Sequence, residues 1–149
     1  MKKFQATLGY ALRILHYLGK DEKKLATGIE ISTALGISYK YLLKVLAKLR
    51  KGNMIQSEQG RDGGYRIAKD LESISICEVI NAIEGKLDLY ESPHGAREYE
   101  GEDNIVRCFN GVQEQVEEYL SGMSVKALFS GEVTAEPLKK AFNNGRVNV

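Results

Sequence analysis

Apolar residues recur at the three- and four-residue spacing of a helix across residues 4–18. They are Phe4, Leu8, Ala11, Leu12, Leu15 and Leu18. A second helix is expected to begin after Thr27, because Thr27 and Glu30 have the spacing of a capping box, and to end at Gly36. Ser38 can cap a third helix. The pattern therefore predicts three helices, the last two joined by a tight turn.

The third predicted helix, which ends at Gly52, has two chemically different faces. One stripe is apolar and consists of Leu42, Val45, Leu46 and Leu49. At 100° per residue, the opposite face collects Lys40, Lys44, Lys48 and Lys51. A tight turn before a helix with an apolar back and a basic front is typical of a helix-turn-helix, whose second helix enters the major groove of DNA. The alternative is an ordinary amphipathic pair of helices with a solvated lysine face.

Two short alternating runs follow, NMIQSE and YRIAK, on either side of the glycine-rich segment QGRDGG. The alternation predicts two half-buried strands with Ile55 and Ile67 facing inward. Glycines allow the turn between them to be tight and to approach another backbone closely. Arg61 can then reach a phosphate backbone or the minor groove. A helix-turn-helix followed by such a hairpin is a winged helix, and the alternative is a plain hairpin with no binding role.

Three further helices are expected, and the last is a short one that is capped by Ser124 after a break at Gly122. Ser75 and Glu78 form a second capping box before a helix that ends at Gly85. Its core-facing residues are Ile76, Val79, Ile80 and Ile83. From Asn104 the apolar residues step by four and three, as in the a/d seam of a coiled coil. This seam consists of Ile105, Phe109, Val112, Val116 and Tyr119. The seam predicts a dimer interface, and the alternative is packing against the helix's own domain.

The predicted fold is therefore mainly α with a small β-hairpin wing: a winged helix-turn-helix domain plus a long C-terminal dimerisation helix. We expect a DNA-binding domain over residues 1–85 and an effector or sensor loop over 86–103. A dimerisation helix region should occupy 104–129. Residues 130–149 form a tail of weak periodicity that can be disordered.

The charge distribution supports a polyanionic partner. The net charge of the 149 residues is only +1, but residues 1–70 hold 14 Lys and Arg against 6 Asp and Glu, whereas 71–149 hold 7 against 14. Such asymmetry suggests that the basic half binds a polyanion. No apolar run has the length of a membrane span, and two cysteines are too few for a disulfide scaffold. We expect a cytoplasmic protein without a membrane partner, and not an enzyme, because no nucleophile–base pair or metal quartet can be assembled.

The order of these motifs resembles the IscR/NsrR/CymR (Rrf-two) family of bacterial winged-helix repressors. The resemblance rests on GISYKYLLKVLAKLRKG, GRDGGYRIA and ISICEVINAIEG, and covers residues 1–129. It implies a homodimer that binds a palindromic operator. Gln59 stands where the family often has an arginine, and Leu43 where some members carry a polar base-reading residue. The base preferences of other members therefore do not carry over to this chain.

The expected DNA contacts come from the third helix and the wing. The resemblance implies contacts by Ser38, Lys40 and Tyr41 and by the wing residues around Arg61. Side chains at the start of the third helix, Tyr39 included, can reach base edges or phosphates. The full set is Thr27, Ser38, Tyr39, Lys40, Tyr41, Lys44, Lys48, Gly60, Arg61, Gly63 and Tyr65.

Cys108 and His94 are the candidates for redox or effector chemistry. In cluster-binding members of the family, the segment corresponding to 86–103 holds three cysteines. Here it leads only to Cys108, and Leu8 stands where some members place an acidic ligand. Because an iron–sulfur cluster normally needs four protein ligands, we expect no cluster, no metal site and no other cofactor. Two alternatives stay open: a redox or metal sensor using Cys108, or control by a small molecule or partner protein at the acidic loop.

Overall fold

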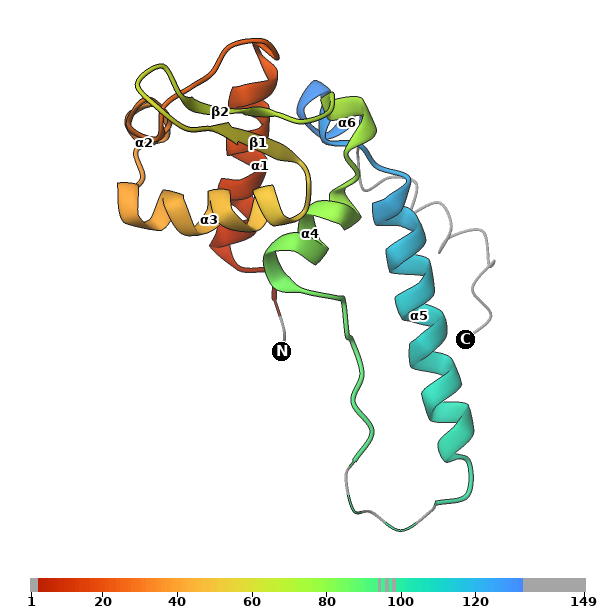
Figure 1. The fold of residues 1–149 in the computed structure, drawn as a ribbon. Helices are drawn as coiled ribbons and strands as arrows, with labels where there is room; N and C mark the ends of the chain where they lie inside the picture. Colours follow the sequence, from red (N-terminus) through yellow and green to blue (C-terminus); the bar gives the residue numbers. More distant parts are fainter. Residues whose placement is uncertain (1–2, 94, 96, 98, 133–149) are drawn as a thin grey trace.

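The computed structural model describes residues 3–93, 95, 97 and 99–132. Six α-helices and a two-stranded hairpin lie within these residues, with one short 3₁₀ turn at Leu71–Ser73 (Figure 1). The elements are α1 (Ala6–Gly19), α2 (Gly28–Leu35), α3 (Tyr39–Lys51), β1 (Ile55–Glu58), β2 (Gly64–Ile67), α4 (Ile76–Glu84), α5 (Glu102–Ser121) and α6 (Val125–Ser130). The order α2–turn–α3–hairpin is a winged helix-turn-helix, so the predicted fold class is confirmed.

Local capping fixes where the helices begin. Thr27 Oγ1 accepts a hydrogen bond from the Glu30 amide at 3.1 Å, and the Glu30 carboxylate accepts one from the Thr27 amide at 2.8 Å. Ser38 caps α3 by accepting from the Tyr41 amide at 3.2 Å. Gly36 ends α2 in the left-handed conformation, with φ +65°. These contacts confirm the predicted starts of α2 and α3, and they fix the tight turn between them.

The capping box of α4 also lowers the pKa of a carboxyl group, that of Glu78. The Ser75 amide donates to the Glu78 carboxylate, and this bond lowers the pKa of Glu78, although partial burial opposes the effect and Lys69 adds to it. A carboxyl whose pKa is lower in the folded chain stabilises the fold above its unfolded pKa. That stabilisation is lost as the pH falls through the folded pKa of Glu78.

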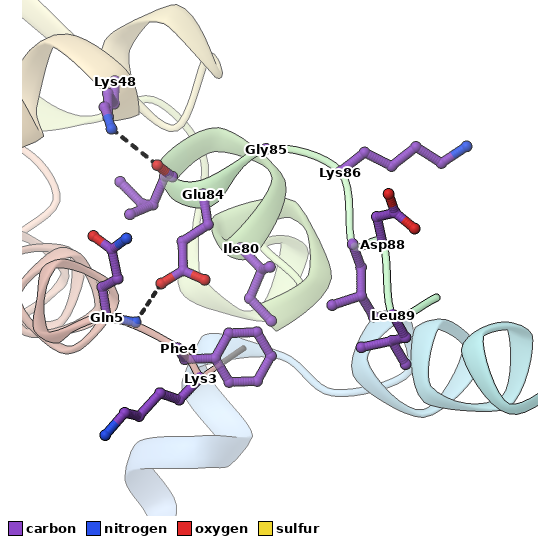
Figure 2. Close-up of a pocket in the computed structure, with 12 residues that line it drawn as sticks. Lys3, Phe4, Gln5, Lys48, Ile80, Glu84, Gly85, Lys86, Asp88 and Leu89 are labelled. Carbon is purple, nitrogen blue, oxygen red and sulfur yellow. Dashed lines mark hydrogen bonds between the residues drawn. The ribbon is translucent and has the colours of Figure 1, made fainter. Parts of the chain in front are cut away.

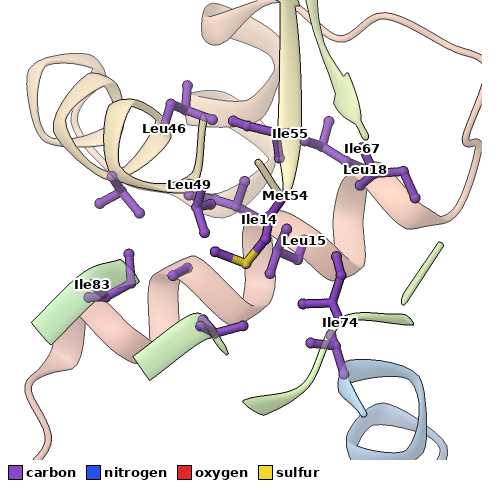
Figure 3. Packing of buried hydrophobic residues seen from close by; sticks show 14 of the residues in the cluster. Ile14, Leu15, Leu18, Leu46, Leu49, Met54, Ile55, Ile67, Ile74 and Ile83 are labelled. Atoms are coloured by element: carbon purple, nitrogen blue, oxygen red, sulfur yellow. The ribbon is translucent and has the colours of Figure 1, made fainter. Parts of the chain in front are cut away.

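The core forms around α1, which lies behind α3 and the wing (Figures 1 and 3). Ile14 and Leu15 of α1 are completely buried. The predicted apolar stripe of α3 is buried as expected, and so is that of α4. Ile14 was not on the predicted stripe of α1, whereas Phe4, which was, lies before the helix and is half exposed. The face of α1 is therefore rotated toward Ile14, because neighbours pack against it from several sides.

The hairpin pairs Ile55 with Ile67, as predicted, and it is joined to the segment before α2. The backbones of Ala26 and Tyr65 exchange two hydrogen bonds, of 2.9 and 2.8 Å. A Cβ at Gly64 would lie 2.7 Å from the Ala26 carbonyl oxygen, and one at Gly63 would overlap the carbonyl oxygen of Glu58. The paired glycines are thus required by close backbone approaches within the protein itself.

The end of the described chain returns to the winged domain. Val125 of α6 is completely buried, and its amide donates to the Ile74 carbonyl at 2.9 Å. The Ile76 amide donates to the Met123 carbonyl at 2.8 Å. Within the expected dimerisation region, residues 104–129, the structure shows the predicted break at Gly122 and the predicted short helix capped by Ser124. Residues after Gly122 pack with the DNA-binding domain, because α6 lies against α1 and the 3₁₀ turn at Leu71–Ser73, with Val125 in the core.

Helix α5 stands at the side of the winged domain (Figure 1). It begins at Glu102 and ends before Gly122, close to the predicted limits. None of its 20 residues is buried. Part of the helix contacts α4, and the loop before it runs along its surface, with the Leu89 amide donating to Gln113 at 3.1 Å. Residues 133–149, which hold most of the predicted tail, lie outside the described residues.

Gly63→Ala should destabilise the wing, because its Cβ would overlap a carbonyl oxygen that cannot move without breaking the hairpin. We expect the free energy of unfolding to fall by about 1–3 kcal/mol in urea denaturation. Gly9→Ala is the control, since the Cβ at this exposed position in α1 meets no atom within 4 Å. That variant should gain about 0.5–1 kcal/mol. Equal stability of the two variants would contradict the steric explanation.

Candidate nucleic-acid interface

The elements that carry the predicted DNA-contacting residues, α3 and the wing, lie with α2 on the side of the molecule away from α5 (Figure 1). Lys40, Lys44 and Lys51 are exposed along α3. None of their ammonium groups has a hydrogen-bond or ion-pair partner within the described part of the chain. This unpaired positive charge on one helix face is suited to phosphate contacts.

Lys48 is placed differently from the other lysines of α3. Its ammonium group donates a 2.9 Å hydrogen bond to the Ile83 carbonyl oxygen, in the last turn of α4 (Figure 2). The carbonyls of a last helical turn have no partner in the helix and carry partial negative charge. Lys48 therefore joins α3 to the end of α4. The expectation of a DNA contact considered the face of α3 alone, and for Lys48 that contact stays a prediction beside this structural role.

The two tyrosines at the start of α3 point in different directions. Tyr41 is half-buried, and its hydroxyl shares a 2.6 Å hydrogen bond with Thr7 of α1. Its ring meets that of Tyr10 edge-on, with ring centroids 5.6 Å apart. Tyr41 thus holds α3 against α1, and its expected contact with DNA stays a prediction. Tyr39 is half exposed and lies over Gly28, where a Cβ would be 2.7 Å from its ring.

Thr27 and Ser38 are exposed at the first residues of two helices. The side-chain oxygen of each accepts a backbone N–H of its own helix. Each hydroxyl keeps its hydrogen for a second bond, so it can still donate to a phosphate oxygen. Both residues therefore remain compatible with the expected phosphate contacts.

The wing presents Arg61 at its exposed tip, next to Gly60, whose φ of +104° favours glycine. Tyr65 is half-buried, and its backbone N–H and C=O are hydrogen-bonded to the backbone of Ala26. The charge of Arg66 is offset by Glu58 at 3.1 Å. Arg61 is thus the cation that the wing tip can offer to DNA.

Arg50, which the sequence reasoning missed, tethers the wing to α3. Its guanidinium donates to the Ser57 hydroxyl of β1 at 3.2 Å. The pairing depends on how the hairpin folds back over α3, so spacing along the chain gave no signal for it. The tether fixes the wing relative to the helix that it accompanies.

An open pocket of about 820 Å³ lies where the loop after α4 passes the start of the chain (Figure 2). Phe4, Ile80 and Leu89 give it apolar walls, and the Gln5 amide donates to Glu84 beside it at 2.5 Å. Part of the predicted effector loop therefore borders a cavity. His94, a candidate for redox or effector chemistry, lies outside the described residues, so its expected role stays a prediction.

The two cysteines do not belong to a set of metal ligands within the described residues. Cys77 is half-buried in α4, and Cys108 is exposed on α5. No group of three or more His, Cys, Asp or Glu that could hold a metal ion occurs within residues 3–93, 95, 97 and 99–132. In the same residues, no helix is long and apolar enough to cross a membrane.

Comparison with known proteins agrees with this geometry. The family model Rrf2, described as an iron-dependent transcriptional regulator, matches residues 4–131. The HTH-type transcriptional regulator NsrR of Shouchella clausii is 41% identical over 83 residues, which are 55% of this chain and 56% of that protein. The chain thus matches about half the length of such curated relatives. The HTH-type transcriptional regulator IscR of Escherichia coli is 41% identical over 59 residues, 40% of this chain and 36% of that protein.

The fold has a close counterpart among solved structures. The global cysteine regulator CymR of B. subtilis superposes with a TM-score of 0.65 at 21% identity, covering 87% of this chain and 98% of that one. At this level of identity the likeness concerns the fold.

The description of the family as iron-dependent does not agree with the sequence-based expectation of no cofactor. The donor set of the described residues, however, does not fit a cluster. It offers one exposed and one half-buried cysteine on different helices, with no third ligand grouped with either. Four protein ligands are the norm for an iron–sulfur cluster.

Lys44→Ala and Lys48→Ala should separate phosphate contact from structural support. Lys44→Ala should weaken binding to every duplex and reduce the salt slope of log K by about 0.9, because one phosphate contact is lost. Lys48→Ala should leave that slope unchanged and lower the thermal unfolding midpoint, because the last turn of α4 loses its cation. Fluorescence anisotropy at several salt concentrations and thermal melts provide the two measurements. An identical loss of slope in both variants would contradict this assignment.

Proposed function

We propose that this chain, which belongs to the Rrf2 family of transcriptional regulators, binds duplex DNA as a homodimer and represses transcription at a palindromic operator. The observation that carries the proposal is the exposed front of α3, where Lys40, Lys44 and Lys51 stand unpaired beside a wing that ends in Arg61. The lysines supply attraction to phosphates, and the N-terminal part of α3 enters the major groove. Such a regulator acts in the bacterial cytoplasm, where the DNA is.

The uncovered face of α5 supports the dimer. Ile105, Phe109 and Val112 are 39%, 42% and 48% exposed, although they form a continuous apolar strip. Val116 and Tyr119 continue the strip and are half-buried. The Tyr90 ring stacks on Phe109 at 4.7 Å, yet leaves it exposed. An exposed apolar strip of this length on a helix needs a partner surface, and a second copy of the same strip supplies one.

The dimer explains how a single recognition helix can read a palindrome. One winged domain reads one half-site, and two half-sites must be about 34–36 Å apart, or a multiple of that, for two domains to bind together. Linking the domains turns the second binding event into an intramolecular one, which raises the overall affinity. Repression then follows where the operator overlaps a promoter.

We further propose that the isolated chain holds no iron–sulfur cluster. The proposal rests on the described donor set, in which Cys77 and Cys108 are not grouped with other ligands. The iron dependence in the family's description would then belong to members with more cysteines.

Ile105→Asp with Val112→Asp should convert the dimer to a monomer, because burying the new carboxylates in the seam costs several kcal/mol. Both residues are exposed in the single chain, so the fold should survive by circular dichroism. Sedimentation should show the monomer, and affinity for a full palindrome should fall by about 10²–10⁴-fold. Asn110→Asp with Gln115→Glu adds the same charge off the strip and should change neither property. A charged-strip variant that stays dimeric would place the interface elsewhere.

Protein purified without oxygen should be colourless and contain substoichiometric iron, because the ligand count is too low for a cluster. Ultraviolet–visible absorption and metal analysis provide the measurement. A visible absorption band that disappears in Cys108→Ala would contradict the proposal, and Cys77→Ala is the matched control on a different helix. In that case the alternative of a redox sensor with Cys108 as a ligand would replace the proposal that the chain holds no cluster.

A further inference from the structure

The exposed front of α3 is not uniformly charged. Leu43 is 37% exposed, and Ala47, four residues later on the same side of the helix, is exposed as well. The apolar positions that α3 needs for the core are already supplied by Leu42, Val45, Leu46 and Leu49, all buried. Leu43 and Ala47 therefore form a small apolar strip that the packing of the chain does not use.

The contacts of the flanking residues show which way this strip faces. Tyr39, one turn before Leu43, lies over Gly28 at the start of α2. Arg50, two turns after it, donates to Ser57 of the wing at 3.2 Å. The strip between them thus lies on the side of α3 that borders α2 and the wing, whereas Tyr41 faces α1 on the other side. This is the side from which a duplex clamped by the wing would approach α3.

We propose that Leu43, supported by Ala47, reads the 5-methyl groups of thymine in the major groove, so that the half-site requires an A·T pair at the position that it covers. The inference rests on the proposed DNA-binding function and names a determinant of its specificity. Lys40 and Lys44 lie beside the strip, on the side away from Tyr39 and Arg50, and can hold phosphates there.

The chemistry of the base edges favours this occupant. In the major groove the thymine methyl is the apolar group of the unmodified base pairs, and the other exposed groups are hydrogen-bond donors or acceptors. A leucine has no polar atom in its side chain. Set against a G·C edge, it would remove water from polar groups without replacing their hydrogen bonds, which is unfavourable. Set against a thymine, it buries a methyl group.

The experiment replaces thymine by uracil, which removes only the methyl group. Duplexes bound by the full-length protein are first selected from a random library, and each thymine of the enriched sequence is then replaced singly by deoxyuridine. For the wild-type chain, one or two substitutions per half-site should weaken binding by about three- to fivefold, the effect of losing one buried methyl group. The remaining substitutions should have no effect.

Two variants assign this sensitivity to a residue. Leu43→Ala should bind thymine and uracil duplexes equally, and because Leu43 is partly exposed, its circular dichroism and melting temperature should stay near those of the wild type. Lys40→Ala is the matched control: it should weaken all duplexes by the same factor and keep the full uracil effect. Sensitivity retained in Leu43→Ala would overturn the inference.

The outcomes separate this inference from the proposed function. If sequences are enriched but no uracil substitution matters, Leu43 reads no methyl group, while sequence-specific binding stands. If no sequence is enriched over the starting library, the proposed function fails and the role of Leu43 fails with it.

Discussion

Ile14 and Leu15, fully enclosed in the middle of α1, are the side chains around which α3, α4, the wing and α6 close. Burial of this one helix face sets the position of the elements that present side chains to DNA. Tyr41 reaches α1 through Thr7, and Lys48 reaches α4, which itself packs on α1. The recognition helix is therefore fixed from behind by apolar packing and at two of its edges by polar contacts. Its front remains free for a ligand.

Structural features that depend on residues close together in the sequence could be predicted well. The capping boxes at Thr27 and Ser75, the turn at Gly36 and the buried stripe of α3 all depend on residues within one or two turns of each other. Local hydrogen bonds and helical periodicity decide such features, so the sequence carries them directly. The fold class follows from their order, and the basic front of α3 follows from the same periodicity.

Features set by contacts between distant segments could not be predicted. Lys48 was assigned to DNA because it shares a face with Lys44, but its partner is a carbonyl 35 residues away. Tyr41 was assigned to base contacts because it lies in the first turn of α3, but its partner is Thr7, 34 residues earlier. The return of α6 to the core gave no periodic signal, because a helix of six residues shows less than two turns of pattern. In each case a contact with a distant segment gives the residue a partner that the local sequence pattern did not indicate.

The anchoring of α5 at one end has a mechanical consequence. Its C-terminal end is tied to the core through Met123 and Val125, whereas Gln113 and Phe109, farther from that end, contact the loop that carries Leu89 and Tyr90. A helix of 20 residues is about 30 Å long, so a tilt of about 10° around the tied end moves the far end by about 5 Å. In the proposed dimer, two such helices act as coupled levers. The distance between the two recognition helices then depends on the tilt of α5, and so does the operator spacing that the dimer fits. The loop at Leu89 and Tyr90, which contacts α5, is positioned to change this tilt.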